Sequence, residues 1–183
     1  MRFMGKVLIA AVAAGLFCST LAAAESGFIG RLGYGLSSLK VEASGGGKSS
    51  DNGGAFDIYG GYRMQNGQFG LSYTNLKCDG CTANYLLASG AYVVEDLHNN
   101  IKPFLGVGVG MFHFKEDGFL DKNGVFGTAN LGVNVEFDNF FVGTEFRQRI
   151  FGGVEKDVKF ASGTVKAKAE PKQTYLLYVG YKF

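Results

Sequence analysis

The chain has little that would form a helical membrane anchor or a nucleic-acid site. Beyond residue 24 it has no long apolar run, and its mean hydropathy is only +0.08. Any residence in a membrane must therefore depend on alternating strands. A net charge of +2 is too small to indicate a nucleic-acid partner. Tryptophan is absent and glycine is abundant; proline occurs only twice and phenylalanine and tyrosine are abundant, which favours strands.

The first residues have the pattern of a secretory signal peptide. Arg2 and Lys6 supply positive charge, an apolar core follows between residues 7 and 21, and small residues end at Ala24. The core is too short for a comfortable membrane helix. Cys18 is not expected to be a lipidation site, because the bulky Phe17 precedes it. The sequence predicts a cleaved signal peptide over residues 1–24 and one domain over residues 25–183.

Eight stretches of the predicted domain alternate with the period of a β-strand. They lie near residues 28–41, 55–64, 68–76, 84–95, 101–114, 125–137, 140–151 and 173–183. The fifth is the most regular, because Leu105, Val107 and Val109 alternate with glycines. The fourth is apolar on both faces, so its register stays open.

Alternation by itself fits two classes of barrel. A soluble, lipocalin-like barrel turns its apolar side chains inward, and a membrane barrel turns them outward. Here the second face mixes glycine with charged residues, which suits a narrow interior where glycine leaves room for long charged neighbours. The connections also alternate, being long near 42–54, 77–83, 115–124 and 152–172 and short near 65–67, 96–100 and 138–139. We therefore predict an all-β, eight-stranded antiparallel up-and-down transmembrane β-barrel with long outer loops and both termini in the periplasm.

Phenylalanines near the strand ends are a third indication of a membrane barrel. Rings at the two interfaces would form the aromatic girdles of such a barrel. The residues assigned to these girdles are Phe28, Phe112, Phe114, Phe137, Phe140, Phe141 and Phe151.

The face opposite the apolar one carries a set of charges that would be enclosed. Its members are Arg31, Asp57, Arg63, Glu136, Glu145, Arg147, Arg149 and Lys182. Eight strands leave an interior just wide enough to be filled by side chains, so a hydrogen-bonded ionic network is the preferred interpretation. A conducting channel lined by these groups is the alternative.

The final strand carries an apolar stripe that ends on an aromatic residue. Tyr175, Leu177, Val179, Tyr181 and Phe183 share one face. This stripe resembles the C-terminal signal that the insertion machinery of bacterial outer-membrane barrels reads.

Together with three internal strands, this ending resembles the eight-stranded outer-membrane barrel family that includes opacity proteins and OmpA-like transmembrane domains. The segment 102–110, Lys-Pro-Phe-Leu-Gly-Val-Gly-Val-Gly, is similar to the family's Pro-aromatic-x-Gly-x-Gly-x-Gly strand, and segments 130–137 and 142–147 fit as well. The resemblance covers essentially the whole predicted domain. It implies a cell outer-membrane location but no particular activity, because this fold carries many functions.

Cys78-Asp79-Gly80-Cys81 lies in the second predicted outer loop. Redox chemistry of the thioredoxin type would need a helix N-terminus beside the motif, and none is expected. A zinc site would need two more ligands, of which His113 is one candidate. The preferred interpretation is a disulfide between Cys78 and Cys81 in an oxidising compartment.

No catalytic, cofactor or metal site is assigned. The histidines are His98, in a predicted short turn, and His113. Barrel enzymes that deacylate lipid A use a histidine with a serine two residues on, and this chain has Lys115 there. The sequence therefore predicts a protein that is not an enzyme.

The last long connection is rich in lysine and could form a hairpin. Val154, Lys156, Val158 and Phe160 alternate, Ser162-Gly163 can turn, and residues 165–169 alternate again. The seventh and eighth strands could therefore continue above the membrane. This segment would either present a ligand-binding edge or lysines for lipopolysaccharide phosphates, or remain a solvated loop.

These observations predict a monomeric, non-enzymatic surface protein of a Gram-negative outer membrane whose outer loops mediate adhesion or another surface interaction. A small porin or transport component is the alternative. Expected partners are outer-membrane lipid and lipopolysaccharide, periplasmic chaperones and the barrel-insertion machinery during biogenesis, and host-surface ligands.

Overall fold

The computed structural model describes residues 26–43, 48–78, 81–95, 100–116, 120–152, 154–160 and 163–183. These residues form nine strands. The strands are β1 (Gly27–Ala43), β2 (Lys48–Met64), β3 (Gly67–Cys78), β4 (Cys81–Val93), β5 (Ile101–Glu116), β6 (Leu120–Phe137), β7 (Phe140–Gly152), β8 (Val154–Phe160) and β9 (Gly163–Lys182). The predicted signal peptide, His98 and most of the predicted turn at 96–100 lie outside the described residues.

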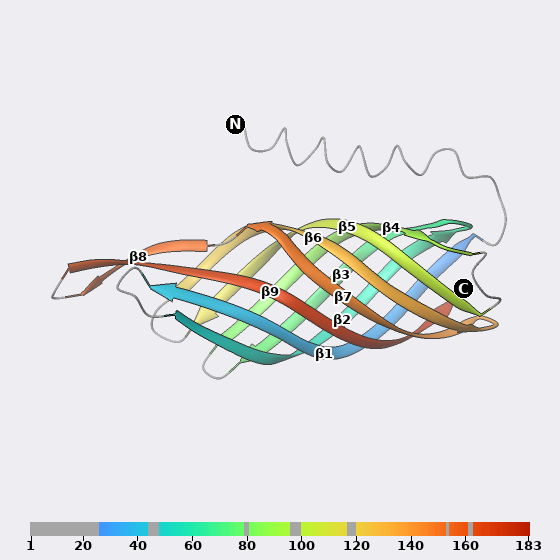
Figure 1. Ribbon diagram of the computed structural model, residues 1–183, viewed down its shortest axis with the longest axis horizontal. Coiled ribbons are helices and arrows are strands. Elements are labelled where there is room, and N and C mark those ends of the chain that lie inside the picture. The colour runs from blue at the N-terminus through green and yellow to red at the C-terminus, as the bar shows by residue number, and fades with distance from the viewer. Residues whose placement is uncertain are drawn as a thin grey trace, which may run out of the picture.

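Eight of these strands close into an antiparallel barrel. Neighbours in the chain pair in order from β1 to β7, β7 pairs with β9, and β9 pairs with β1. The remaining strand, β8, pairs with the first half of β9 and projects from one end of the cylinder (Figure 1). The predicted hairpin that continues the last two barrel strands is therefore confirmed.

The two ends of the barrel differ in shape. At one end, the terminal mouth, lie Ser26, Phe183 and tight turns such as Asp138-Asn139, where Asp138 has φ of +54°. Asp and Asn tolerate this left-handed conformation, which two-residue hairpins require. At the other end, the hairpin mouth, β1–β2, β5–β6 and β8–β9 continue as paired strands (Figure 1).

The predicted division of the two faces is confirmed. Apolar side chains point outward, and Leu105, Val107 and Leu177 are 65%, 61% and 70% exposed. Asp57 and Glu145 are 0% and 2% exposed inside the cylinder. The open register of β4 is also settled: Tyr85, Leu87 and Val93 point inward, whereas Leu86 and Tyr92 point outward. The described residues include no helix long and apolar enough to cross a membrane.

The predicted long loops are mostly strand. The β1–β2 ladder runs to Glu42↔Lys48, and the β5–β6 ladder runs to Glu116↔Leu120. The prediction of a long connection at 77–83 was wrong, because β3 ends at Cys78 and β4 begins at Cys81. Cross-strand hydrogen bonds continue beyond the apolar belt, where both faces of a strand can meet water. The alternation that reveals strands in the sequence therefore fades there.

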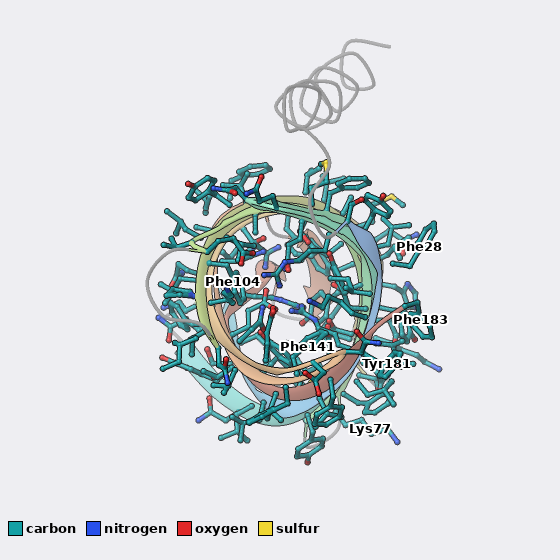
Figure 2. All side chains as sticks on the ribbon, turned by 90° about the vertical axis from the view of Figure 1, so that its right-hand side faces the viewer. Phe28, Lys77, Phe104, Phe141, Tyr181 and Phe183 are labelled. Carbon is teal, nitrogen blue, oxygen red and sulfur yellow. A yellow bond between two sulfur atoms is a disulfide. The ribbon has the colours of Figure 1, made fainter. Side chains whose placement is uncertain are left out.

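Three of the predicted girdle rings lie inside the barrel. Phe112, Phe114 and Phe141 are between 1% and 3% exposed, so their assignment to an interface was wrong. Figure 2 shows Phe141 and Phe104 within the cylinder and Phe28 on its outer surface. Phe28, Phe137, Phe140 and Phe151 are exposed, as the girdle prediction requires.

Glycines lie across from several of the enclosed rings. On β7 and β9, Phe141 is paired with Gly180, and Tyr178 is paired with Gly143. A Cβ at Gly143 would lie 2.5 Å from the Tyr178 ring. Phe104 and Gly132 on β5 and β6 repeat the arrangement. The glycines therefore make room for flat rings, where we expected room for charged side chains.

Candidate functional site

The middle of the barrel is closed by four buried charges from β1, β2 and β7. Arg147 donates to Asp57 (Nη1 to Oδ2, 2.8 Å) and to Glu145 (Nε to Oε1, 2.8 Å). Arg31 forms an ion pair with Glu145 and lies 3.9 Å from Asp57. Thr74 donates to Asp57 at 2.6 Å. Two cations thus face two anions among side chains that are almost wholly buried, and each buried charge has a partner of opposite sign, as buried charges require.

Aromatic rings hold Arg31 in this network. Its guanidinium carbon lies 4.4 Å from the centre of the Tyr59 ring and 4.5 Å from the centre of the Tyr178 ring. Tyr178 in turn donates a hydrogen bond of 2.6 Å to Asn134 on β6. The charges, rings and amide together connect strands from opposite walls of the barrel, so this level is filled by side chains.

A second ionic group lies at the terminal mouth. Arg63 contacts both Glu95 and Glu136 at 2.7 Å, Lys102 contacts Glu95 at 2.6 Å, and Lys182 lies 3.6 Å from Glu136. Sequence reasoning missed Glu95 and Lys102, because they lie in or beside a connection where strand alternation assigns no face. Burial of Glu95 opposes ionisation, but hydrogen bonds and charge from Lys102 and Arg63 outweigh it and lower its pKa.

A third level, toward the hairpin mouth, is mainly aromatic. Tyr85, Phe112 and Phe126 contact one another with ring centres 5.7 to 6.2 Å apart. Arg149 lies over Phe112 and Phe126, at 4.9 and 5.3 Å, and its Nε donates to the Phe151 carbonyl. The structure therefore places Arg149 among rings and apart from the four charges at mid-barrel.

A small cavity lies between the middle level and the aromatic level. Its volume is about 30 Å³, and its lining includes Thr74, Thr128 and Arg147. Such a space holds about one or two water molecules. Of the eight charged residues predicted to be enclosed, four meet at mid-barrel, three meet at the terminal mouth and one packs on rings.

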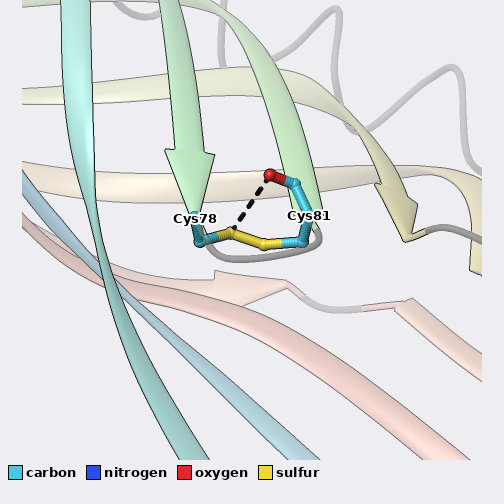
Figure 3. The surroundings of a disulfide bond; sticks show 2 residues. All are labelled: Cys78 and Cys81. Carbon is cyan, nitrogen blue, oxygen red and sulfur yellow. Dashed lines mark hydrogen bonds between the residues drawn. A yellow bond between two sulfur atoms is a disulfide. The ribbon is translucent and has the colours of Figure 1, made fainter.

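The two described cysteines end β3 and begin β4. The structure pairs Cys78 with Cys81 in a disulfide (Figure 3). The Cys78 sulfur also lies 3.5 Å from the Cys81 carbonyl oxygen. The link joins two directly paired strand residues at the tip of a hairpin, which keeps the ladder closed at the hairpin mouth.

His113 lies on the outer surface of β5, and its Nδ1 is 2.8 Å from the Asn123 amide oxygen on β6. No group of three or more His, Cys, Asp or Glu side chains that could hold a metal occurs among the described residues. The disulfide and the histidine therefore lie in separate surroundings, and the structure does not bring them together as zinc ligands.

A sheet projects from the hairpin mouth. β1 pairs with β2 on one side and with the first half of β9 on the other, from Leu39↔Pro171 to Ala43↔Ala167. β8 then pairs with β9 from Val154↔Ala169 to Phe160↔Gly163. The order β2–β1–β9–β8 forms what we call the projecting sheet, and β8 is its edge strand in the part of the chain that the structure describes.

The apolar stripe of β9 lies on the outside of the barrel. Tyr175, Leu177, Val179, Tyr181 and Phe183 are all exposed. Phe183 is 79% exposed, and its ring packs edge-on against Tyr181 (Figure 2). The Phe183 backbone donates to the Phe28 carbonyl at 2.8 Å. The terminal residue is thus held by the barrel while its ring faces away from it.

Comparisons with known proteins identify the fold. No family model and no curated protein matches the chain. The structure is similar to that of Neisserial surface protein A, with a TM-score of 0.62 and 22% identity over 87% of this chain and 100% of that one.

The chain has the fold of the eight-stranded outer-membrane β-barrels.

Two further solved structures are less similar. They are the attachment invasion locus protein Ail of Yersinia pestis (TM-score 0.41, 15% identity, 86% of this chain and 99% of that one) and the N-terminal β-barrel domain of OprF from Pseudomonas aeruginosa (TM-score 0.43, 15% identity, 82% of this chain and 97% of that one). An outer surface of exposed Leu, Val, Phe and Tyr around an ionic interior agrees with this fold. The fold is therefore that of an outer-membrane β-barrel.

Proposed function

We propose that the protein is a monomeric, non-enzymatic surface protein whose projecting sheet mediates adhesion or another surface interaction. In this proposal the terminal mouth faces the periplasm and the hairpin mouth faces the outside. The observation that carries the proposal is a paired sheet rising from one end of a barrel that side chains fill.

The sheet is suited to binding because its backbone is ordered by strand pairing. A loop would have to lose conformational freedom on binding, whereas a paired strand has already lost most of it. The edge strand β8 offers unpaired backbone groups on one side, a surface to which another chain can add. Its sequence contains Lys156 and Lys159 together with Glu155 and Asp157, charges that discourage self-association of the edge.

Removing the sheet's outer hairpin tests this proposal. Replacing residues 153–170 by a two-residue Asn-Gly turn would leave the β7–β9 barrel ladder, which ends at Gln148↔Gln173, in place. We expect lower binding to host cells and lower survival in serum, with unchanged folding on heat-modifiable gels. A variant with Lys156→Gln and Lys159→Gln keeps the hairpin and shows whether charge carries the effect. Unchanged binding and survival after the deletion would contradict the adhesion proposal.

Planar-bilayer recordings separate this function from that of a small porin. The network at mid-barrel joins opposite walls, so we expect the purified protein to give no discrete conductance steps. Reproducible openings that change size in Glu145→Gln would overturn the filled-interior proposal and favour the porin alternative.

During biogenesis we propose that the exposed stripe of β9 is the segment read by the insertion machinery after transit with periplasmic chaperones. The side chains that would be read are those of the outward face that ends at Phe183. We further propose that the folded barrel contacts lipopolysaccharide where its outer surface meets the outer leaflet.

A further inference from the structure

Outward-facing side chains of β3 to β6 change from apolar to polar to cationic toward the hairpin mouth. Three rows follow from the strand register. The apolar row is Tyr73, Leu86, Met111 and Val125; the polar row is Asn75, Asn84, His113 and Asn123; the cationic row is Lys77, Thr82 and Lys115, and the register partner of Lys115 on β6 is Asp121. Lys77 and Lys115 are exposed, and Figure 2 shows Lys77 directed away from the barrel.

The alternation of the strands fixes these directions. Leu76 and Phe114, the neighbours of the two lysines, are 0% and 1% exposed inside the barrel. A register slip would enclose both cations without an acidic partner and bring two large apolar side chains to the surface. The cationic row therefore belongs to the outer surface.

Hydrogen bonds organise the polar row. Asn84 accepts from the Asn75 amide at 2.7 Å and from the Tyr73 hydroxyl at 2.9 Å. His113 and Asn123 form the second pair of the row at 2.8 Å. An open groove of about 390 Å³ is lined by Asn84, His113 and Asn123 of the polar row and by Leu86, Met111 and Val125 of the apolar row. The groove thus has an apolar end and a polar end.

We propose that this groove holds the lipid A part of one lipopolysaccharide molecule. An acyl chain lies against Leu86 and Met111, the sugar hydroxyls meet the polar row, and Lys77 and Lys115 contact phosphate. The site deepens the lipopolysaccharide contact proposed above and rests on the same orientation of the barrel.

Size and charge favour lipid A over an ordinary phospholipid. The polar row crosses four strands, or three interstrand spacings, which is about 14 Å. That width suits a disaccharide head group, whereas a glycerophospholipid has one phosphate directly above its chains. The polar row also lies between the apolar row and the cations. In lipid A the sugar occupies the corresponding place between the acyl chains and the phosphates. Lysine is a good point-charge partner for phosphate.

Native mass spectrometry of the full protein in detergent tests the site. The probes are bisphosphorylated lipid A, the same lipid without its phosphates, and phosphatidylglycerol. We expect lipid A to bind preferentially, and Lys77→Gln with Lys115→Gln to weaken it about tenfold, since each exposed charge contact contributes modestly. Lipid A without phosphates should bind the original protein and this double variant equally.

Two further variants sharpen the result. Lys172 is a cation at the same mouth, but it lines the small cavity beside Thr74 and Arg147 and not the groove. Lys172→Gln should therefore leave lipid A binding unchanged. Asp121 is the register neighbour of Lys115 on β6, so Asp121→Asn should tighten binding. Equal affinity of the double variant and the original protein for lipid A would overturn this site. If the original protein shows no preference for lipid A over phosphatidylglycerol, the proposed lipopolysaccharide contact itself fails.

Discussion

At the scale of single residues, the barrel depends on how completely its enclosed charges are compensated. Arg147 contacts both Asp57 and Glu145, whereas Arg31 contacts mainly Glu145. Removing a partner from a buried ionic group leaves an uncompensated charge, which is far more costly than removing both members. The mid-barrel network should therefore respond to mutation as one unit.

Arg147→Gln tests this coupling. It leaves two carboxylates facing Arg31, and we expect it to lower the free energy of unfolding by about 3–5 kcal/mol. Urea titration in lipid vesicles, followed by tyrosine fluorescence, measures the change. Asp57→Asn combined with Arg147→Gln should cost less than the sum of the single variants. A loss below about 1 kcal/mol for Arg147→Gln would show that the network contributes little.

Glu95 gives the terminal mouth a dependence on pH. Its pKa is lowered from 4.5 in the folded protein, chiefly because hydrogen bonds from Lys102 and Arg63 outweigh the effect of burial. A lowered folded pKa means that the ionised carboxylate stabilises the fold above pH 4.5 and that this contribution is lost as pH falls through the lowered value.

We therefore expect the free energy of unfolding to fall on acidification, and to fall less in Glu95→Gln. Unfolding in urea at about pH 7 and about pH 3 measures both slopes. Glu136 keeps Arg63 paired in the variant, which limits other changes. Identical slopes for the two proteins would contradict the assignment.

At the scale of strands, aromatic residues that point into the barrel are paired with glycines on neighbouring strands. The enclosed rings of Phe104, Phe112, Phe141 and Tyr178 each lie across from a glycine on a neighbouring strand, whereas Phe114 lies across from Ala83 and Lys122. The sequence showed the glycines, and strand alternation gave their face correctly. It could not show which side chains occupy the space above them, because that depends on the register between neighbouring strands.

Gly180→Ala tests this packing. The added methyl group would meet the Phe141 ring, and we expect a loss of about 1–3 kcal/mol from overpacking. Gly60→Ala is the matched control, because a Cβ there has nothing within 4 Å. Urea unfolding in vesicles compares the two. Equal effects would show that ring contact is not what selects glycine at Gly180.

At the scale of the whole molecule, the apolar belt decides where the barrel is stable. Val107 lies on the outer face of β5, is 61% exposed and has Gly90 and Ala129 as its register neighbours, so no polar side chain lies beside it in its row. In hydrocarbon, such exposure is favourable, whereas in water it would promote aggregation.

Val107→Lys should therefore destabilise the folded barrel by about 2–4 kcal/mol in vesicles, since a charge near the bilayer midplane is costly. Val107→Leu should change little. Reversible unfolding in vesicles of matched thickness measures both. A lysine variant as stable as the original protein would place this part of β5 in water and contradict the assigned belt.

For residues 154–169 the sequence left a hairpin and a solvated loop open, and the structure shows the hairpin. The sequence by itself determined the barrel class and the two faces of most strands. These follow from local alternation, because one register is strongly preferred wherever one face meets hydrocarbon and the other encloses charge. Alternation could not place Glu95 or Lys102 near the turns, settle β4, or separate enclosed rings from interfacial ones. Those features depend on which residues meet across the cylinder. Only closure of the barrel brings Arg31, Asp57 and Arg147 together, because strands far apart in the chain become opposite walls of one narrow interior.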